Sequence, residues 1–308
     1  MKFKRIGLLG GTGFVGRHLA ARLVEKGYHV RVLSRDPERH RGLKVLPTLE
    51  LMAADVRDPT ALCRGFVGCD AAINLVGILN EGRRGRGFQA VHVDLPRKVL
   101  DACGAAGVRR LLHMSALNAD PSRGPSHYLR SKGEGEDLTH LAAGQGLQVT
   151  SFRPSVIFGP DDGFLNRFAA LLEWAPGVFP LACPNARFAP VYIGDVVDAM
   201  TIALEDRASV GRRYELCGPH GYTLHQLVAY VARLRGLRRR VVDLGDWPSR
   251  LQARVLERMP GKPFSYDNYL SLQADSVCRE DGLASLGIEP TPLEAVAPAY
   301  LRRHVAAR

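Results

Sequence analysis

Apolar, β-branched segments alternate with helix-like patterns through the first half of the chain. The strand-like segments are RIGLLG, HVRVLS, LELMAAD, DAAINLVG, RRLLHMS and LQVTSFRP, at residues 5–10, 29–34, 49–55, 70–77, 109–115 and 147–154. Helical patterns lie between them at 14–26 and 92–107, and another begins near Tyr128. This alternation is typical of βαβ units, so it predicts an α/β fold with a doubly wound parallel sheet. Right-handed crossovers then place helices on both faces of the sheet.

Three glycines follow the first strand at three-residue spacing and open the first helix, in GGTGFVG. A glycine turn between a strand and a helix is typical of dinucleotide binding, because it permits a tight turn and a close approach of the backbone to a pyrophosphate. Main-chain N–H groups at the helix start then meet the phosphates. The alternative is a tight turn without a ligand. We predict that the cofactor contacts Gly10, Thr12, Gly13, Phe14, Val15 and Gly16.

After Pro154 the pattern loosens, and proline and glycine become frequent, as in FGPDDG and WAPGVFPLACP. We predict a Rossmann domain over residues 1–153 and a smaller, mainly helical lobe over 154–308 that lies above the strand ends, where parallel sheets bind ligands. The segment of about 190–218, which contains PVYIGDVVDAMTIAL and RRYELCG, is expected to return to the Rossmann domain.

The end of the second strand indicates which dinucleotide is bound. NAD-binding units usually place an acidic residue there to hold the ribose 2′-hydroxyl, but this chain has Ser34 and Arg35. A guanidinium pairs well with a 2′-phosphate, so we predict NADP(H) rather than NAD(H). Asp36 comes later, before a proline, and is interpreted as a turn or helix-cap residue.

Two further positions near the predicted nucleotide have alternative interpretations. Arg17 is either a second phosphate contact or a solvated helix residue. Asp55, with Val56, follows the third strand and is expected to meet the adenine, with a helix cap before DPTAL as the alternative.

The segment SHYLRSKGEGED places Tyr128 and Lys132 four residues apart, on one face of a helix. A nearby ammonium favours phenolate and so lowers the pKa of a tyrosine. Such a tyrosine exchanges a proton with a substrate oxygen while hydride moves, and the lysine also holds the nicotinamide ribose. Ser115, at the end of the fifth strand, is expected to donate a hydrogen bond to the substrate carbonyl. The alternatives are a surface helix pair and a capping or loop serine.

These residues resemble the extended or atypical branch of the short-chain dehydrogenase/reductase superfamily. The glycine spacing, DV after the third strand, NLVG after the fourth, Y-x-x-x-K and RPSVIFGP all fit that branch. Downstream, FGPDDGFLNRFA, PVYIGDV, YELCGPHGYTLHQLVAYV and LGIEPTPLE are similar to the family of the nucleotide-binding accessory subunit nine of mitochondrial complex I and its bacterial relatives, over nearly the whole chain. The resemblance implies that Asn74 and Gly77 line the path of the nucleotide and that the backbone from Pro154 to Val156 meets the nicotinamide.

The resemblance implies two different functions. The superfamily contains reductases, dehydrogenases, epimerases and dehydratases, whereas the complex I subunit carries NADPH as a structural component, and some relatives are tied to ubiquinone synthesis. We predict an NADP(H)-dependent oxidoreductase that moves hydride to or from a carbonyl or alcohol, with a quinone- or isoprenoid-related substrate as one possibility. A non-catalytic accessory protein and a nucleotide-sugar epimerase or dehydratase are the alternatives.

Two positions depart from the pattern of that branch. HMSALNA has one hydroxyl where many of its enzymes have two or three, and His92 stands where the branch often has asparagine. Both departures affect the proton-handling residues rather than the cofactor site.

The formal net charge is +11. No zinc-finger, helix-turn-helix or aromatic RNA-binding pattern accompanies it, so we expect no nucleic-acid partner, and a solvated basic surface is the plainest interpretation.

In DWPSRLQARVLERMPGKPF, the residues Trp247, Leu251, Val255 and Met259 fall at four-residue steps, with arginines alongside. A peripheral contact of 247–262 with a membrane surface or a protein complex is one hypothesis, and a core-facing helix with a solvated basic side is the alternative that we favour. The loop EGRRGRGF (81–88) is a second basic segment near the expected site.

Six cysteines are scattered at 63, 69, 103, 183, 217 and 278, without a C-x-x-C pair or a histidine cluster. We therefore predict no metal site, and thiols that stay free in a reducing compartment. No apolar run reaches the roughly 18 residues of a membrane span, and the apolar stretch near the N-terminus is too short for a signal peptide. The expected location is cytoplasmic, with a peripheral position at the inner face of a membrane as an extension of the membrane hypothesis. The sequence determines neither the substrate nor the oligomeric state.

Overall fold

A computed structural model describes residues 3–82, 87–260 and 262–302. At its centre lies a seven-stranded sheet in the order β11-β6-β5-β4-β1-β2-β3, and its neighbouring strands pair in parallel. The strands are β1 (Arg5–Leu9), β2 (His29–Ser34), β3 (Leu49–Ala53), β4 (Ala71–Asn74), β5 (Arg110–Met114), β6 (Gln148–Pro154) and β11 (Arg213–Leu216). The predicted doubly wound α/β fold is confirmed. The strand order reverses between β1 and β4, the place where such sheets bind ligands beyond their carboxyl ends.

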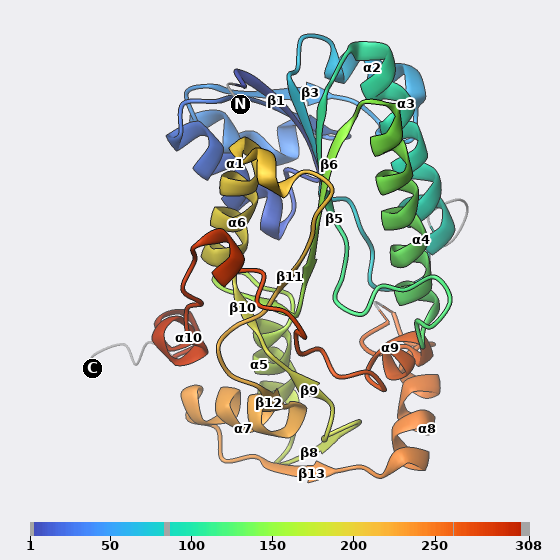
Figure 1. Ribbon diagram of the computed structural model, residues 1–308. Helices are drawn as coiled ribbons and strands as arrows, with labels where there is room; N and C mark the ends of the chain where they lie inside the picture. The colour runs from blue at the N-terminus through green and yellow to red at the C-terminus, as the bar shows by residue number, and fades with distance from the viewer. Residues whose placement is uncertain (1–2, 83–86, 261, 303–308) are drawn as a thin grey trace.

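Helices cover both faces of this sheet (Figure 1). One face carries α1 (Phe14–Glu25) and α6 (Ile193–Glu205), and the other carries α2 (Pro59–Phe66), α3 (Leu95–Ala106) and α4 (His127–Leu141). Leu8 and Leu9 are both fully buried, although they belong to hydrophobic clusters on opposite faces. Burial on both faces explains why the strands appear in the sequence as continuous apolar runs rather than as alternating patterns.

The second lobe has a core of its own. Its helices are α5 (Leu165–Trp174), α7 (Leu224–Leu234), α8 (Asp246–Leu256), α9 (Tyr266–Ser271) and α10 (Leu293–Leu301). Three short strand pairs join them: β7 (Ile157–Phe158) with β10 (Val191–Tyr192), β9 (Arg187–Phe188) with β12 (Tyr222–Thr223), and β8 (Val178–Leu181) with β13 (Arg240–Asp243). Short 3₁₀ helices lie at 38–45, 142–145, 207–209 and 284–286, and a π-helical turn, Gln89–Asp94, leads into α3. The lobe is mainly helical, as predicted, and the strand pairs are additions that the sequence analysis missed.

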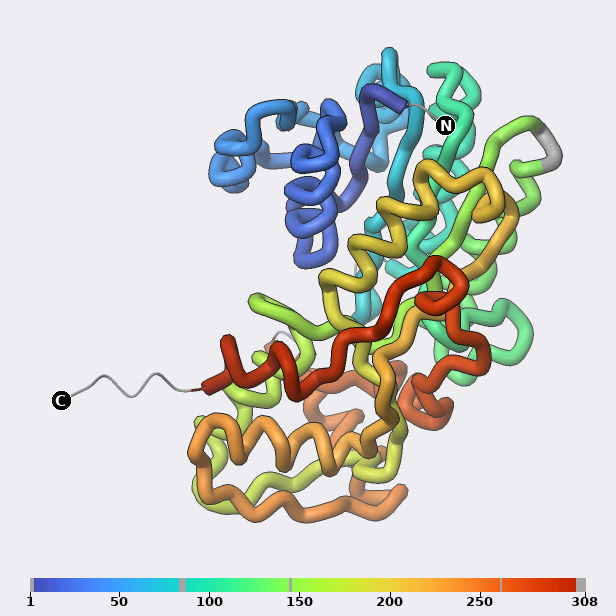
Figure 2. The backbone as a smooth tube through the Cα atoms, turned by 60° about the vertical axis from the view of Figure 1, so that its left-hand side comes forward, coloured from blue at the N-terminus to red at the C-terminus, as the bar shows by residue number. Residues whose placement is uncertain are grey.

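The chain passes between the two lobes more than once. Both α6 and β11 come after Pro154 yet pack with the N-terminal sheet, and the segment that follows α9 runs back beside them before α10 begins (Figure 2). The Gly282 N–H donates to the Glu215 carbonyl, with a nitrogen–oxygen distance of 3.1 Å. Two segments therefore connect the second lobe to the edge of the main sheet: β11 itself, and the segment after α9 that returns beside it.

Two of the cysteines are paired. Cys217, just after β11, and Cys278, in the returning segment, form a disulfide. The prediction that all six thiols are free is wrong for this pair, because a separation of 61 residues leaves no local motif and only the fold brings the two segments together. The pairing removes the cysteines as support for a reducing compartment. The free thiols are Cys63, Cys69, Cys103 and Cys183.

Among the helices within the described ranges, none combines the length and the apolar character needed to cross a bilayer. Residues 83–86 of the basic loop EGRRGRGF, and residue 261 of the basic stretch 247–262, lie outside the described residues.

Candidate active site

The turn between β1 and α1 is built for close approach of a ligand to the main chain. Gly10 adopts φ 77°, a conformation that favours glycine, and a Cβ on Gly16 would lie 2.2 Å from the Gly10 carbonyl oxygen. Helix α1 has no acidic residue in its first turn, and its N-cap, Gly13, has no side chain to bind the first N–H groups. These amides, at the positive end of the helix, fit the pyrophosphate of a dinucleotide.

The larger side chains of this turn point into the protein. Phe14 and Val15 are partly buried against the cluster between α1 and the sheet, and the ring of Phe14 meets that of His18 edge-to-face with 5.5 Å between centroids. Thr12 is partly exposed. The main chain at Phe14 and Val15, rather than their side chains, is therefore what the turn offers to a ligand.

At the end of β2, Arg35 is the side chain that remains free to contact a ligand. The Ser34 hydroxyl is buried and accepts the Asp36 N–H at 3.3 Å. The Asp36 carboxylate accepts the Arg39 N–H at 3.2 Å, which confirms the prediction of a turn-cap role for Asp36. Arg35 is exposed and forms no ion pair with any residue in the described ranges. A free guanidinium beside an occupied carboxylate fits a phosphate better than a ribose hydroxyl.

Arg17 lies beside a loop of the second lobe. Its Nη2 is 3.7 Å from Oδ2 of Asp161, and both side chains are largely exposed. A pair this exposed contributes little to stability. The hypothesis that Arg17 binds phosphate stays a prediction.

The acid at the end of β3 is paired with its neighbour. Arg57 Nη2 lies 2.6 Å from Asp55 Oδ2, and this hydrogen-bonded pairing lowers the pKa of Asp55 to about 2, with Arg35 adding a smaller effect. Asp58, whose carboxylate accepts the Thr60 N–H, is the cap of α2, so the alternative in which Asp55 caps that helix is wrong. The influence of Arg35 shows that the ends of β2 and β3 are close, as one nucleotide site requires. Val56 is half-buried against the second core cluster.

The turn after β4 leads to the lysine. Asn74 is buried, and its side-chain oxygen accepts the Val76 N–H at 3.1 Å. A Cβ on Gly77 would lie only 3.3 Å from Nζ of Lys132. The structure thus brings together Asn74, Gly77 and Lys132, which are distant in the sequence.

Helix α4 carries the predicted pair and is held from the other lobe. Ser126 caps it by accepting the Leu129 N–H. The Asp267 carboxylate, from α9, accepts the N–H groups of His127 at 2.7 Å and Tyr128 at 3.1 Å. The first turn of α4 contains no acid, so Asp267 supplies the negative charge that a helix N-terminus favours.

Tyr128 is partly buried between two aromatic rings, those of Phe88 at 5.9 Å and His92 at 5.5 Å between centroids. Its main-chain N–H and carbonyl are bonded to Asp267 and Ser131. Its phenol oxygen has no hydrogen-bond partner within the part of the chain that the structure describes. That oxygen is therefore open to a ligand.

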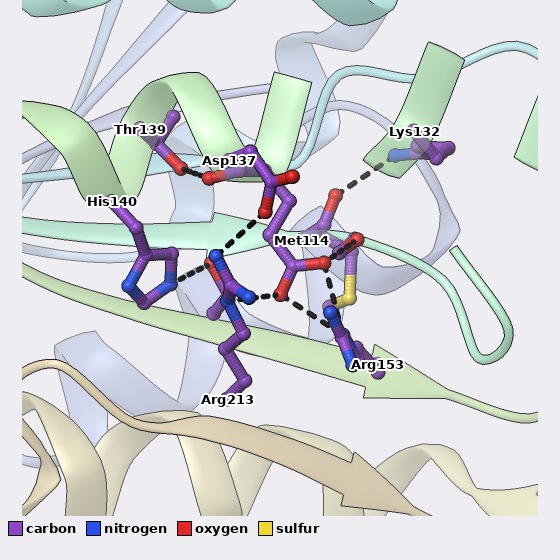
Figure 3. Close-up of polar contacts among 10 residues, drawn as sticks. Met114, Lys132, Asp137, Thr139, His140, Arg153 and Arg213 are labelled. Atoms are coloured by element: carbon purple, nitrogen blue, oxygen red, sulfur yellow. Dashed lines mark hydrogen bonds and ion pairs between the residues drawn. The ribbon is translucent and has the colours of Figure 1, made fainter. Parts of the chain in front are cut away.

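The lysine and the tyrosine are not electrostatically coupled in the way the sequence predicts. Lys132 is buried and its Nζ donates to the Met114 carbonyl at 2.8 Å (Figure 3). Burial lowers the pKa of Lys132 to about 8 and raises that of Tyr128 to about 12. The expectation of a lowered tyrosine pKa is wrong here, because burial dominates. Tyr128 is therefore a protonated phenol at neutral pH.

Ser115 belongs to a buried ionic network. Its hydroxyl donates to Oε2 of Glu136 at 2.8 Å. Glu136 is fully buried, and the guanidinium groups of Arg153 and Arg213 approach it at 2.9 and 3.5 Å (Figure 3). Arg213 also bonds Asp137 at 2.7 Å. The serine proton is therefore directed to Glu136, although the oxygen can still accept a hydrogen bond.

His92, which replaces the asparagine of the related branch, holds the loop after β4 against α4. Its Nε2 accepts the Ile78 N–H at 3.1 Å, so Nδ1 carries the proton that faces the Ser131 hydroxyl at 2.9 Å. That hydroxyl donates to the Tyr128 carbonyl at 2.9 Å. Burial, and then the charge of Lys132, lowers the pKa of His92 to about 2, so it is neutral. Its place in a π-helical turn is typical of functional sites.

The strand-six side of the site is fixed by main-chain contacts. The Pro154 carbonyl accepts the Leu117 N–H at 3.1 Å, and the Val156 carbonyl accepts the Val191 N–H at 3.0 Å. The contact of Pro154 and Val156 with nicotinamide stays a prediction. Since β1 to β6 are parallel, their ends bring the glycine turn, Arg35, Gly77 and the tyrosine helix to one edge of the sheet.

The model of the NAD dependent epimerase/dehydratase family matches residues 6–217, which include the glycine turn, the Tyr128–Lys132 helix and β11. The chain belongs to this NAD dependent epimerase/dehydratase family. Members of the family bind NAD(P), and this member has the corresponding NAD(P)-binding fold. The resemblance to the extended branch of the short-chain dehydrogenase/reductase superfamily is thereby confirmed.

Curated relatives of this family member cover most of its length. It is 32% identical over 309 residues to "NADH dehydrogenase [ubiquinone] 1 alpha subcomplex subunit 9, mitochondrial" of Mus musculus, covering 96% of this chain and 79% of the mouse protein. It is 32% identical over 256 residues to the ceramide reductase of Caulobacter vibrioides, covering 82% and 76%. The predicted similarity to the complex I subunit family is confirmed.

Solved structures agree with the fold. The NADPH-dependent quinone oxidoreductase QOR2 of Escherichia coli, complexed with NADPH, matches with a TM-score of 0.75 and 22% identity, over 96% of this chain and 99% of that one. A UDP-galactose 4-epimerase matches with 0.74 and 20%, over 97% and 96%. At these identities the likeness shows the fold alone.

Sequence reasoning missed three residues of this family member's site. Glu136 lies four residues after Lys132, so helical spacing could have placed it on the same face. Asp267 and Arg213 come from segments far away in the chain, and no sequence signal connects them to the tyrosine helix.

Proposed function

We propose that this protein is an NADP(H)-dependent reductase that converts a carbonyl group to an alcohol. The observation that carries the proposal is the geometry around Tyr128: its phenol oxygen has no hydrogen-bond partner among the described residues, and it lies on the same helix as Lys132, whose Nζ is next to Gly77. The name of the ceramide reductase relative supports a reductase. A lipid-like or quinone-like carbonyl compound is the substrate class that we propose.

The glycine turn, Arg35 and Lys132 would hold NADPH, which would supply the hydride for the carbonyl carbon. Tyr128 donates its proton to the carbonyl oxygen, so a ketone becomes a CH–OH alcohol; with a quinone the same hydride and proton give the hydroquinone. Lys132, protonated below a pH of about 8, stabilises the phenolate that remains and binds the ribose hydroxyls next to Gly77. The Ser115 hydroxyl donates to Glu136, so its oxygen is left to accept a hydrogen bond from the hydroxyl of the alcohol product.

The preference for NADP(H) rests on Arg35. An exposed guanidinium at the end of β2 forms charge-assisted hydrogen bonds with a 2′-phosphate, whereas the nearby Asp36 carboxylate is occupied by the main chain. We expect Arg35→Ala to weaken NADPH binding about tenfold or more and to leave NADH binding nearly unchanged. Arg64→Ala, an exposed arginine on α2, is the matched control.

A non-catalytic role is the second candidate. The proton of Ser115 and the ammonium of Lys132 are both bonded within the protein, to Glu136 and to the Met114 carbonyl. The mouse relative is named as a subunit of NADH dehydrogenase. In this role the bound nucleotide would stabilise the fold by mass action.

Turnover by a tyrosine variant separates the two candidates. Nucleotide released from the purified protein is identified by mass spectrometry, and NADPH oxidation is then followed with long-chain ketones and quinones. We expect Tyr128→Phe to retain NADPH binding and to lose at least about a hundredfold in kcat, while the control Tyr230→Phe, half-buried in the second lobe, stays at the wild-type level. Tightly bound NADPH that no carbonyl or quinone oxidises, in wild type and variant alike, would favour the accessory role.

A further inference from the structure

Helix α8 turns its large apolar side chains outward. Trp247, Leu251 and Val255 follow at four-residue steps and are 72%, 48% and 54% exposed, and Met259, in the turn after the helix, continues the row at 49%. We call these four residues the α8 stripe. The alternative in which the stripe faces the core is therefore wrong. A continuous row of exposed apolar side chains marks an interaction site more often than a scattered one does.

Small residues explain why α8 packs this way. The buried side of the helix contains Ser249 and Ala253, both almost inaccessible to solvent. The Ser249 hydroxyl accepts the Cys183 N–H at 3.2 Å and so ties α8 to the end of β8. The small side chains of Ser249 and Ala253 thus let α8 pack closely against the rest of the lobe. A rotation of α8 about its axis that buried the stripe would break the contact between Ser249 and Cys183.

The stripe is flanked by arginines that aromatic rings hold in place. The guanidinium of Arg250 lies 5.7 Å from the ring centroid of Tyr269, and that of Arg254 lies 5.3 Å from the ring of Tyr266. Arg258 is exposed and donates to the Arg254 carbonyl at 2.7 Å.

The acidic residues near the α8 stripe do not cancel the positive charge of the arginines beside it. Asp246 pairs with Arg250 at 3.0 Å, Glu257 is half-buried, and the Asp267 carboxylate is directed to α4. The charge beside the stripe is therefore positive, complementary to anionic headgroups.

The far end of the stripe adjoins the predicted active site. Nζ of Lys262 donates to the Glu81 carbonyl at 2.9 Å, and Nδ2 of Asn268 donates to the Leu79 carbonyl at 3.1 Å. Leu79 is 64% exposed and follows Ile78, whose N–H binds His92. In Figure 1, α8 forms the outer lower edge of the molecule, next to α9 and below α4. A surface bound by the stripe would therefore lie beside the loop that leads to Gly77.

We propose that the α8 stripe and its flanking arginines form a peripheral docking surface for an anionic lipid bilayer. The row is one residue wide and exposed along its whole length, and its tryptophan shares the helix with charged side chains, as at membrane interfaces. The arginines bind the headgroups while Trp247, Leu251 and Val255 enter the boundary with the acyl chains. Docking places the bilayer beside the loop at 78–82, and this consequence rests on the proposed function: a lipid-like carbonyl compound would have a short path to the site. This binding is independent of the proposed reduction and of whether Tyr128 reacts.

Sedimentation with vesicles tests the apolar contribution. The full chain is mixed with vesicles of phosphatidylcholine alone or with phosphatidylglycerol added, at low and at physiological salt. We expect binding only to the anionic vesicles and at least a tenfold loss of affinity for Leu251→Ser/Val255→Ser. The matched control is Val45→Ser/Val67→Ser, two valines 81% and 62% exposed on the first domain. All four side chains are exposed, so the variants should melt like the wild type.

A second pair of variants tests the charges. Arg254→Gln/Arg258→Gln is expected to lose affinity for anionic vesicles and to show a weaker dependence on salt, whereas Arg41→Gln/Arg64→Gln, exposed arginines of the first domain, should change neither as much. Equal losses in the two pairs would mean that net charge alone drives binding and would overturn the assignment to α8.

Tryptophan fluorescence reports the depth of insertion. The chain has two tryptophans, so Trp174→Phe leaves Trp247 as the sole emitter. We expect its emission to shift to the blue on anionic vesicles and to be quenched by lipids brominated near the headgroup. Two results would overturn the proposal: no binding to anionic vesicles at low salt, or an unchanged emission of vesicle-bound protein. The first result would leave an acidic protein as the partner that binds the α8 stripe. NADPH turnover without lipid should be unaffected by the stripe variants, so failure here is distinct from failure of the proposed reductase.

Discussion

The hydroxyl of Ser115, at the end of β5, donates to the carboxylate of Glu136, in the middle of α4, across 2.8 Å. Both side chains are buried, and Glu136 lies one helical turn after Lys132. The same carboxylate binds Arg153 and Arg213. One buried charge thus orients the predicted catalytic serine and ties α4 to β6 and β11.

Replacement of this charge should destabilise the fold. Glu136→Gln keeps the size and can still accept from Ser115, but it leaves Arg153 and Arg213 without their buried counter-charge. Loss of one partner of a fully buried pair costs about 3–5 kcal/mol; because the two arginines are partly exposed, we expect about 2 kcal/mol. Urea unfolding measures this loss, with the exposed Glu134→Gln as the control. Equal midpoints for both variants would show that the ion pairs contribute nothing.

The pH dependence of reduction should follow Lys132. Its pKa is about 8, and the proposed role requires the protonated ammonium, so kcat/KM for NADPH-dependent reduction should fall as pH rises through about 8. Tyr128, with a pKa of about 12, stays protonated over this range. Lys132→Met should be slower at every pH and lack the transition near 8. A wild-type profile that is flat well above pH 8 contradicts the role assigned to the lysine.

Three neutral histidines should make the protein sensitive to mild acid. Burial lowers the pKa of His92 to about 2, of His113 to about 3 and of His140 to about 4, from 6.5. The unfolded chain therefore binds more protons than the folded one between these values, and stability falls as pH drops below 6.5. Each histidine contributes up to about 1.4 kcal/mol per pH unit.

Unfolding free energies measured between neutral pH and the pKa of His140 give the slope directly. His113→Met should make this slope shallower, since one of the groups with a lowered pKa is removed, while the exposed His29→Gln should leave it unchanged. A stability that does not change over this interval contradicts the neutral burial of the three rings.

Gly16 tests the nucleotide turn. Its Cβ would meet main-chain atoms of Gly10 and Gly11 at 2.2 to 2.7 Å, and main chain cannot move aside as a flexible side chain can. We expect Gly16→Ala to destabilise by about 3 kcal/mol and to weaken NADPH binding measured by calorimetry. Gly104→Ala is the control: nothing lies within 4 Å of its Cβ, and it lies inside α3. It should be neutral or stabilising by up to about 1 kcal/mol.

The disulfide should stabilise the returning segment. Loss of a cross-link that spans 61 residues costs up to about 4 kcal/mol in the chain-entropy model. Cys217→Ser/Cys278→Ser should therefore melt lower than wild type, and a reductant should lower the melting temperature of the wild type but not of the variant. Cys63→Ser, at a free and partly exposed cysteine, serves as the control. If the reductant acts equally on all three proteins, the cross-link is not the cause.

Local patterns were sufficient for the main sheet. Strands such as β1 and β5 are buried on both faces, so each is a continuous apolar run, and glycine spacing identified the turn after β1. Pairs of two residues, such as β9 with β12, have no such pattern, because tertiary packing alone brings them together.

The site was predictable only in part, because the spacing of residues along the sequence does not show which groups their side chains contact. The four-residue step between Tyr128 and Lys132 places both on one face of α4, but it could not show that the ammonium bonds Met114 and that burial raises the tyrosine pKa. Similarly, the periodicity of α8 reveals an apolar row without indicating whether the row faces the core or the solvent; the small residues Ser249 and Ala253 on the opposite side were the available signal.

Asp267 connects the second lobe to the start of the helix that carries Tyr128. It belongs to the lobe that covers the strand ends, yet its carboxylate holds the main chain of Tyr128. A change in the second lobe that removes this acceptor from α9 would leave the N–H groups of His127 and Tyr128 without their partner. A second lobe transplanted from a relative would therefore keep the first turn of α4 in place only if it brought an equivalent of Asp267 with it.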